Sequence, residues 1–166
     1  MIKKRDVATL ILLSFITCGI YSLFFWWGYI KDINKVCEGD GKKSPNYLVV
    51  FLLTILTFGL YDFYWSYKQG NRLQAIAPNY GLSFAKGGSA VLTWNLFGSL
   101  VSAGGALLSQ LIQSNNPETL LPVNTIVSLV FSLAGYVFFA VSWNILIKNL
   151  NAAGAVYNLA ADTTAE

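Results

Sequence analysis

The sequence predicts an all-α integral membrane protein with four apolar helical segments, in a single membrane domain over residues 1–166. Its mean hydropathy is +0.53, and only 11% of its residues are charged, against about 25% in soluble domains. No charged residue occurs in four long stretches, which are 7–30, 44–61, 87–117 and 119–147. A spanning helix needs about 20 apolar residues, and a soluble chain of this length could hardly bury four of them.

The first two segments are copies of one unit. Residues 12–21 (LLSFITCGIY) and 52–61 (LLTILTFGLY) agree at five of ten positions, and the other positions exchange similar residues. A motif that recurs at a fixed period indicates one structural unit used twice. We therefore predict one repeat unit over residues 7–37 and a second over 46–78. Because the motif recurs deep in the chain, residues 7–30 are expected to be mature structure rather than a signal peptide.

Each unit continues from the motif into aromatic residues and then into polar ones. The aromatic residues are Phe24, Phe25, Trp26, Trp27 and Tyr29 in the first unit and Phe63, Tyr64, Trp65 and Tyr67 in the second. Rings with a polar tip are favoured at the boundary between membrane and water. These clusters are therefore predicted to form interfacial belts, after which Lys31 and Lys68 mark the emergence into water.

Residues 88–150 are predicted to form a transmembrane helical hairpin. Its helices are joined by a polar turn at 113–117, and Pro122 suits a first helical turn. Small residues recur every four positions along the first helix at Gly98, Ser102 and Ala106. Such a stripe lets another helix approach closely, so we expect an internal helix seam, with a dimer face as the alternative. The last dozen residues are small and polar and are expected to fray.

The repeated motif is predicted to interrupt its helix. Its key positions are Thr17, Gly19 and Tyr21 in the first copy and Thr57, Gly59 and Tyr61 in the second. Glycine inside a helix costs about 1 kcal/mol relative to alanine, and its special use is a left-handed backbone. A nearby threonine hydroxyl can bond the backbone groups that a break leaves open. Each unit is therefore either a kinked span or a re-entrant hairpin that turns back within the bilayer.

The positive charges lean slightly towards re-entrant hairpins, and both topologies stay open. If all four segments span, seven of the eleven Lys and Arg residues lie on one side and four, between Lys31 and Lys43, on the other. If the first two units turn back, all eleven lie on one side, which agrees with the cytoplasmic bias of Lys and Arg. Most Lys and Arg residues are thus expected to be cytoplasmic.

The motif residues also carry a family resemblance. The first copy has TCGIY at 17–21, followed by Phe25-Trp26 and Asp32-Ile33-Asn34, and the second has TFGLY at 57–61 with Tyr64-Trp65. These motifs resemble a bacterial membrane family known as domain of unknown function 4234, over about residues 7–75. The resemblance implies a prokaryotic membrane protein, and it brings no known activity and no catalytic residue. We expect a multi-pass protein of the bacterial inner membrane.

The sequence offers little enzyme chemistry. It contains no His, which is the commonest general base and a frequent metal ligand, and its eight Asp and Glu residues are scattered. Two cysteines, Cys18 and Cys37, are too few for a disulfide framework or a zinc site and are expected to be free thiols. We predict no enzyme activity, catalytic residue, cofactor or metal site. A cluster of Asp32, Asp62 and Arg72 around one cavity would argue otherwise.

Four polar residues in the apolar segments are candidates for an intramembrane site: Asp62, Asn95, Gln110 and Asn124. An ionisable residue at such a position is a functional hypothesis by default. The simpler interpretation, which we favour, places Asp62 at the interface in a pair with Lys68. It assigns the amides to hydrogen bonds between helices.

The function that follows from these observations is structural. We expect a non-enzymatic membrane component that shapes the bilayer or binds a protein partner, with the lipid bilayer and anionic lipids near the basic loops as its partners. A second copy of the chain and another membrane protein are further candidate partners. Nucleic acid is not, because a formal net charge of +3 is modest. The alternative is a small ion or solute channel or transporter with a path near Asp62.

Overall fold

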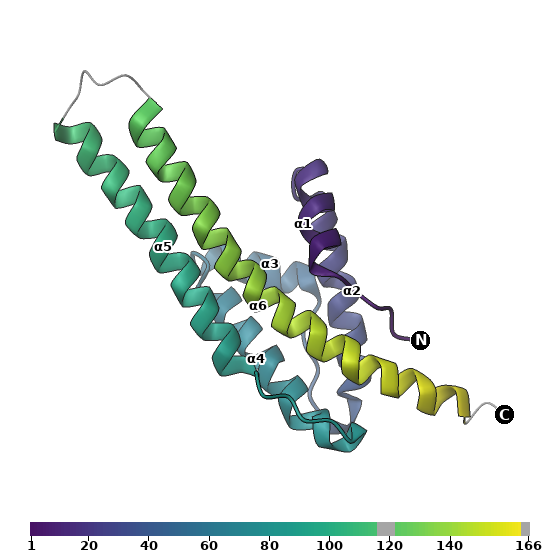
Figure 1. The fold of residues 1–166 in the computed structure, drawn as a ribbon. Helices are drawn as coiled ribbons and strands as arrows, with labels where there is room; N and C mark the ends of the chain where they lie inside the picture. Colours follow the sequence, from purple (N-terminus) through teal and green to yellow (C-terminus); the bar gives the residue numbers. More distant parts are fainter. Residues whose placement is uncertain (116–121, 164–166) are drawn as a thin grey trace. The chain divides into compact units, whose positions relative to one another are not determined.

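The computed structural model describes residues 1–115 and 122–163, and every regular element among them is helical (Figure 1). The elements are α1 (Val7–Ile16), α2 (Ile20–Val36), η1 (Glu38–Asp40), α3 (Tyr47–Leu56), α4 (Leu60–Ile76), η2 (Ala77–Tyr80), α5 (Gly88–Asn115) and α6 (Pro122–Thr163). The all-helical class is thereby confirmed for the described residues. The chain divides into two compact units, the hairpin unit (Met1–Leu92 with Trp143–Glu166) and the α5–α6 unit (Thr93–Ser142).

The first four α-helices repeat one pattern with a period of 40 residues. α1 and α3 have 10 residues each, and α2 and α4 have 17 each. Every boundary in the second pair lies 40 residues after its counterpart in the first. The apolar segment of each unit is therefore not one continuous helix, because it stops and restarts across residues 17–19 and 57–59.

A single threonine caps two helix ends at each break. The hydroxyl of Thr17 donates to the carbonyl of Leu13 at 2.7 Å, and the same oxygen accepts from the N–H of Tyr21 at 2.9 Å. The N–H of Gly19 donates to the carbonyl of Ser14 at 2.7 Å. The Gly19 bond satisfies a carbonyl that the end of α1 leaves open, and Thr17 satisfies an N–H left open at the start of α2. The Leu13 carbonyl also accepts from the backbone N–H of Thr17 at 3.0 Å. These groups therefore do not depend on water where the helix breaks.

The second copy has the same geometry. Thr57 makes both hydroxyl bonds at the same two distances, 2.7 and 2.9 Å. The φ angle is +90° at Gly19 and +92° at Gly59, and it is +50° at Cys18 and +51° at Phe58. A left-handed backbone is open to glycine but unfavourable for a bulky side chain. The residue between Thr and Gly therefore carries a strain of about 1–2 kcal/mol.

Replacing Thr17 with valine should lower the free energy of unfolding by about 1–2 kcal/mol, because valine keeps the shape of threonine and loses both capping bonds. Thr57→Val should have the same effect. Thr17→Ser keeps the hydroxyl and should lose less than half as much. A denaturant titration of the purified protein in mild detergent measures the three values. Equal losses from the valine and serine variants would show that the hydroxyl bonds do not hold the break.

At each break the chain folds back on itself. Arg5, which precedes α1, forms an ion pair at 2.5 Å with Asp32 near the end of α2. In the second copy, the hydroxyl of Ser44 donates to the side-chain carbonyl of Gln69 at 2.7 Å, and the ring of Tyr47 in α3 contacts a ring in α4. We call α1–α2 hairpin 1 and α3–α4 hairpin 2. Each hairpin has a tip at its motif and a base where its two ends meet.

The tips of the two hairpins lie at the same end of the hairpin unit. Trp26 of α2 packs against Trp65 of α4 with ring centroids 5.8 Å apart. Further along both helices, Asn34 accepts a hydrogen bond from Arg72 at 3.0 Å. Because the contacts occur in the same order along α2 and α4, these helices run in the same general direction. The two bases therefore lie next to each other at one end of the hairpin unit, and both tips lie at the other end.

Several aromatic residues after each motif form a core rather than the predicted belts. Trp26 contacts Phe25, Tyr29, Trp65 and Trp143, with ring centroids 5.2 to 6.2 Å apart, and all but the last are buried. The prediction was wrong for these residues because the two repeats pack ring against ring instead of presenting the rings outward. Edge-to-face contacts of this kind add about 0.5–1.5 kcal/mol beyond burial. Rings that stay exposed are Phe24, Tyr64 and Tyr67.

Two asparagines of α6 hold the N-terminal residues in place. Asn151 accepts from the N–H of Arg5 at 2.9 Å and donates to its carbonyl at 2.7 Å. Asn158 binds the N–H and carbonyl of Ile2 in the same way, at 2.6 and 2.9 Å. The two asparagines are two helical turns apart and lie on one side of α6. α6 continues to Thr163, so the predicted fraying is wrong up to that residue.

In the α5–α6 unit, the two helices pack side by side through small residues (Figure 1). A Cβ at Gly98 would lie 2.9 Å from the carbonyl oxygen of Gly135, and a Cβ at Gly135 would clash with Ser102. Further along the pair, the hydroxyl of Ser109 donates to the carbonyl of Asn124 at 2.9 Å. Gly98 and Ser102 therefore lie in an internal seam. The polar turn predicted at 113–117 falls partly outside the described residues.

Ala106 does not belong to this seam. It is exposed, whereas Gly105 is buried at a point where a Cβ would clash with the ring of Phe131. An α-helix has 3.6 residues per turn. Residues that face a neighbouring helix along a straight line are therefore alternately four and three positions apart. The seam follows Gly98, Ser102, Gly105 and Ser109, and the strict spacing of four used in the prediction drifts off it.

α5 and α6 are long and apolar enough to cross a membrane. They have 28 and 42 residues, which is about 42 and 63 Å of helix against about 30 Å of hydrocarbon. Only 22% and 11% of their most apolar stretches are buried within the protein, which is little for core helices of a soluble domain. α1 and α3 measure about 15 Å each. Of the four predicted apolar segments, two are thus continuous helices long enough to be candidates for membrane spans.

Candidate functional site at the bases of the hairpins

The bases of the two hairpins meet in a polar cluster around Arg72. Its guanidinium donates to both carboxylate oxygens of Asp40, at 2.6 and 3.2 Å, and to the carbonyl of Lys42 at 2.6 Å. It also donates to the side-chain oxygen of Asn34 and the hydroxyl of Ser44, each at 3.0 Å. Arg72 therefore binds α4 to the end of α2 and to the linker between the two hairpins.

The pair of Arg72 and Asp40 is partly shielded from water, more so on the arginine side. The Arg72 side chain is 5% exposed and the Asp40 side chain is 18% exposed. Burial acts to raise the pKa of Asp40, but hydrogen bonds from Arg72 and from the N–H of Lys42 outweigh it and hold that pKa below its ordinary value. The carboxylate is thus charged at neutral pH. Its contribution to stability is lost only as the pH falls through the lowered pKa.

The base of hairpin 1 contains a second ion pair, between Arg5 and Asp32. The guanidinium of Arg5 also lies 5.3 Å from the ring centre of Phe25 and donates to the Phe25 carbonyl at 3.4 Å. A Cβ at Gly28 would lie 2.6 Å from a guanidinium nitrogen. Glycine at this position therefore lets Arg5 approach α2 closely and join the N-terminal residues to it.

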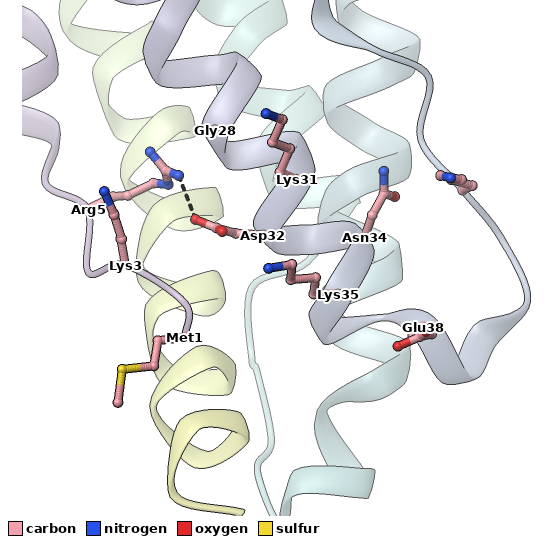
Figure 2. A pocket seen from close by; sticks show the side chains of 10 residues that line it. Met1, Lys3, Arg5, Gly28, Lys31, Asp32, Asn34, Lys35 and Glu38 are labelled. Carbon is pink, nitrogen blue, oxygen red and sulfur yellow. Dashed lines mark hydrogen bonds and ion pairs between the residues drawn. The ribbon is translucent and has the colours of Figure 1, made fainter. Parts of the chain in front are cut away.

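A basic pocket of about 590 Å³ lies beside this second ion pair. Its lining contains five basic residues and two acidic ones. Figure 2 shows Lys31 and Lys35 extending from α2 towards the side on which Arg5 lies. The ammonium of Lys31 is 5.6 Å from the ring centre of Trp27. An excess of positive charge around a hollow of this kind favours the binding of an anion.

The opposite end of the hairpin unit is apolar. Phe58 is 98% exposed and Phe15 is 86% exposed. Further exposed apolar residues beside the motifs are Leu12, Ile16, Ile20, Leu56 and Leu60. Large exposed apolar patches mark contact with lipid or with another protein. The hairpin unit therefore has an apolar end at its tips and a polar, basic end at its bases.

Asp62 lies in the first turn of α4, and the structure does not give it the predicted partner. The ammonium of Lys68 lies 5.5 Å from the ring centre of Tyr64 and 3.5 Å from its hydroxyl. Among the described residues, no ion pair joins Lys68 to Asp62. The aromatic ring one turn away is a nearer partner for the lysine on the same helix face.

The three candidate amides do not gather in one place. Asn95 is buried and Gln110 is exposed, and their positions on α5 are about 22 Å apart along the helix. The side-chain amide of Asn124 donates to that of Gln113 at 3.3 Å, which links α6 to α5. This contact is of the helix-packing kind favoured for Asn124 from the sequence.

The residues whose clustering would have suggested an enzyme are paired separately. Asp32 binds Arg5, and Arg72 binds Asp40. Within residues 1–115 and 122–163, no three potential metal-ligating side chains lie together. Cys18 and Cys37 are both free, the first exposed and the second buried. Burial raises the pKa of the Cys37 thiol to about 11.

The repeated motifs and both ion pairs fall within one recognised sequence region. Residues 5–75 match the family described as Domain of unknown function (DUF4234). The resemblance inferred from the Thr-x-Gly motifs is thereby confirmed. The DUF4234 region covers less than half of the chain, and it includes both tips and the Arg72 cluster but neither α5 nor α6. No curated protein and no solved structure matches the chain.

Sequence reasoning missed the residues that hold the DUF4234 region together. Arg5 and Arg72 bind carboxylates 27 and 32 residues away, and no spacing rule links residues that far apart. A signal did exist for the asparagines that hold the N-terminal residues. Asn151 and Asn158 are seven residues apart, the spacing of two helical turns, and they mark one polar stripe along α6.

Proposed function

We propose that this chain is a non-enzymatic component of the bacterial cytoplasmic membrane that shapes or organises the bilayer. In this proposal α5 and α6 cross the membrane, and hairpins 1 and 2 enter it from the cytoplasmic side and turn back. The observation that carries the proposal is the polarity of the hairpin unit, with two apolar tips at one end and the basic bases at the other. Arms of about 15 Å reach the centre of a bilayer with about 30 Å of hydrocarbon but cannot cross it.

The capped break supports insertion of the tips into lipid. Broken backbone at membrane depth is tolerated only where its polar groups are satisfied. Thr17 and Thr57 each satisfy one open N–H inside the turn, and the N–H groups of Gly19 and Gly59 each donate to a carbonyl that the first helix leaves open. The strained Phe58 side chain finds almost no cover within the described protein, and hydrocarbon would provide it.

The charges support the same orientation. With both bases at one membrane surface, the eleven Lys and Arg residues of the chain all fall on that side, in agreement with the cytoplasmic bias of basic residues. Two wedges that enter one leaflet expand it relative to the other. Insertion into one leaflet is stronger where the membrane is curved. Because such coupling is reciprocal, the inserted protein in turn stabilises curved membrane.

Cysteines placed at Lys3 and Lys42 should react with a membrane-impermeant maleimide from the same side of the membrane. In the re-entrant topology both positions lie on the cytoplasmic side, whereas a spanning first unit would place them on opposite sides. Cys18→Gly removes the exposed native thiol. Buried Cys37 can stay, because a thiol pKa of about 11 leaves roughly one thiolate in ten thousand at pH 7.

The labelling compares inverted with right-side-out membrane vesicles, each variant being made separately in the Cys18→Gly background. The background protein without an added cysteine is the control for reaction at Cys37. Labelling of Lys42→Cys and Lys3→Cys from opposite sides would refute the re-entrant topology. A membrane-shaping role further requires that reconstitution at rising ratios of protein to lipid yields smaller or tubular vesicles.

A further inference from the structure

The basic pocket at the base of hairpin 1 has positive charge that the protein does not neutralise. The charge of Arg5 is matched by Asp32. Lys3, Lys31 and Lys35 have no acidic partner among the described residues, and all three are exposed. Lys31 and Lys35 lie one helical turn apart and therefore share a face of α2. The pocket thus has several ammonium groups that are available to an anionic ligand.

The walls of the pocket are held in place before any ligand binds. The N-terminal residues are fixed by the asparagine bonds of α6 to Ile2 and Arg5. Arg5 is bound in turn to α2 through Asp32 and the Phe25 carbonyl. A site formed in advance avoids part of the ordering cost of binding. Its volume of about 590 Å³ is in the range of small-ligand pockets.

The depth of the pocket agrees with the position of lipid headgroups. From the tip at Gly19 to Lys31 is about 18 Å along α2. A tip at the bilayer centre is about 15 Å from the edge of the hydrocarbon. When hairpin 1 is inserted, Lys31 lies just beyond that edge, where lipid phosphates are found. The ring of Trp27 beneath the Lys31 ammonium suits the same boundary, since aromatic rings are favoured there.

We propose that this pocket binds the phosphate-bearing headgroup of an anionic phospholipid, with Lys3, Lys31 and Lys35 as the cationic contacts. The inference rests on the re-entrant insertion proposed above, because only insertion brings the pocket to headgroup depth. Glu38, one of the two acids in the lining, weakens the attraction. Bound lipid neutralises the pocket and ties hairpin 1 to the surface of an anionic membrane.

The test uses the full chain in phosphatidylcholine vesicles that contain a small fraction of spin-labelled lipid. The fraction of immobilised label is compared for phosphatidylglycerol and phosphatidylcholine at physiological salt. Lys31→Gln/Lys35→Gln should lower the preference for phosphatidylglycerol about fivefold or more, since one lysine near an anionic surface accounts for a factor of about five. Lys68→Gln/Lys86→Gln is the matched control, with the same change in charge outside the pocket, and it should lower the preference less than twofold. Glu38→Gln should raise the preference.

Equal losses from the two double variants would overturn the proposal, because they would indicate diffuse attraction rather than a pocket. Displacement of the labelled lipid by inorganic phosphate at a matched phosphate concentration would assign the site to a soluble anion instead. Wild-type protein that inserts with the topology proposed above but shows no preference for phosphatidylglycerol contradicts the pocket alone. Protein whose hairpins do not insert contradicts the proposed function and the pocket together.

Discussion

Replacing Arg72 with alanine should lower the free energy of unfolding by about 2–3 kcal/mol, because it removes a buried side chain that makes charge-assisted hydrogen bonds and leaves a half-buried carboxylate without its partner. The Arg72 side chain makes five hydrogen bonds to four residues. Removal opens the contacts to Asp40, Asn34 and the Lys42 carbonyl at once. A denaturant titration in mild detergent measures the loss.

Lys68→Ala is the matched control for this variant. Lys68 lies one turn before Arg72 on α4 and is exposed, so its replacement should change the stability by about 0.5 kcal/mol or less. Arg72→Lys keeps the charge but cannot reproduce the forked bonds to Asp40, and it should fall between the two. A loss below 1 kcal/mol for Arg72→Ala would contradict the assignment of this cluster as the joint between the hairpins.

The features that the sequence revealed are local ones. The repeat could be seen because Thr17 and Gly19 recur as Thr57 and Gly59 in similar apolar surroundings. The chemistry of the break also followed from residue types. A threonine hydroxyl can bond backbone groups that a break leaves open, and glycine permits the left-handed backbone that the break needs. Such interactions depend on the spacing of residues along the chain, which can be read directly from a single sequence.

The features that the sequence did not reveal depend on how the repeats pack. Arg72 and Asp40 become partners only after both hairpins have formed. Trp26 and Trp65 were predicted at an interface because their ring type favours one. They lie in a core instead, since the two repeats bring their rings together. Ring type predicts a preference, and it does not determine which neighbour satisfies that preference.

The two ends of the hairpin unit require each other in the proposed function. Apolar tips without a rigid base would collapse against the nearest apolar surface of the protein. Arg72 joins the two bases, and the aromatic core between α2 and α4 sets the direction of both tips. The exposed apolar residues at the tips are therefore held outward, away from the aromatic core of the hairpin unit.

Replacing Phe58 with aspartate should lower the free energy of unfolding in lipid bicelles by about 3 kcal/mol, the cost of a carboxylate at the centre of a bilayer. The expectation for the same variant in water has the opposite sign. Phe58 is 98% exposed and has a φ of +51°, and aspartate tolerates a left-handed backbone better than a bulky residue does. A tip surrounded by water would therefore gain stability from this substitution, whereas a tip surrounded by lipid would lose stability.

Leu159→Asp, at another exposed apolar position near the end of α6, is the control and should change the stability by about 0.5 kcal/mol. An SDS titration of the variants in bicelles measures both values, and an unchanged or increased stability of Phe58→Asp would show that the tip of hairpin 2 does not lie in hydrocarbon.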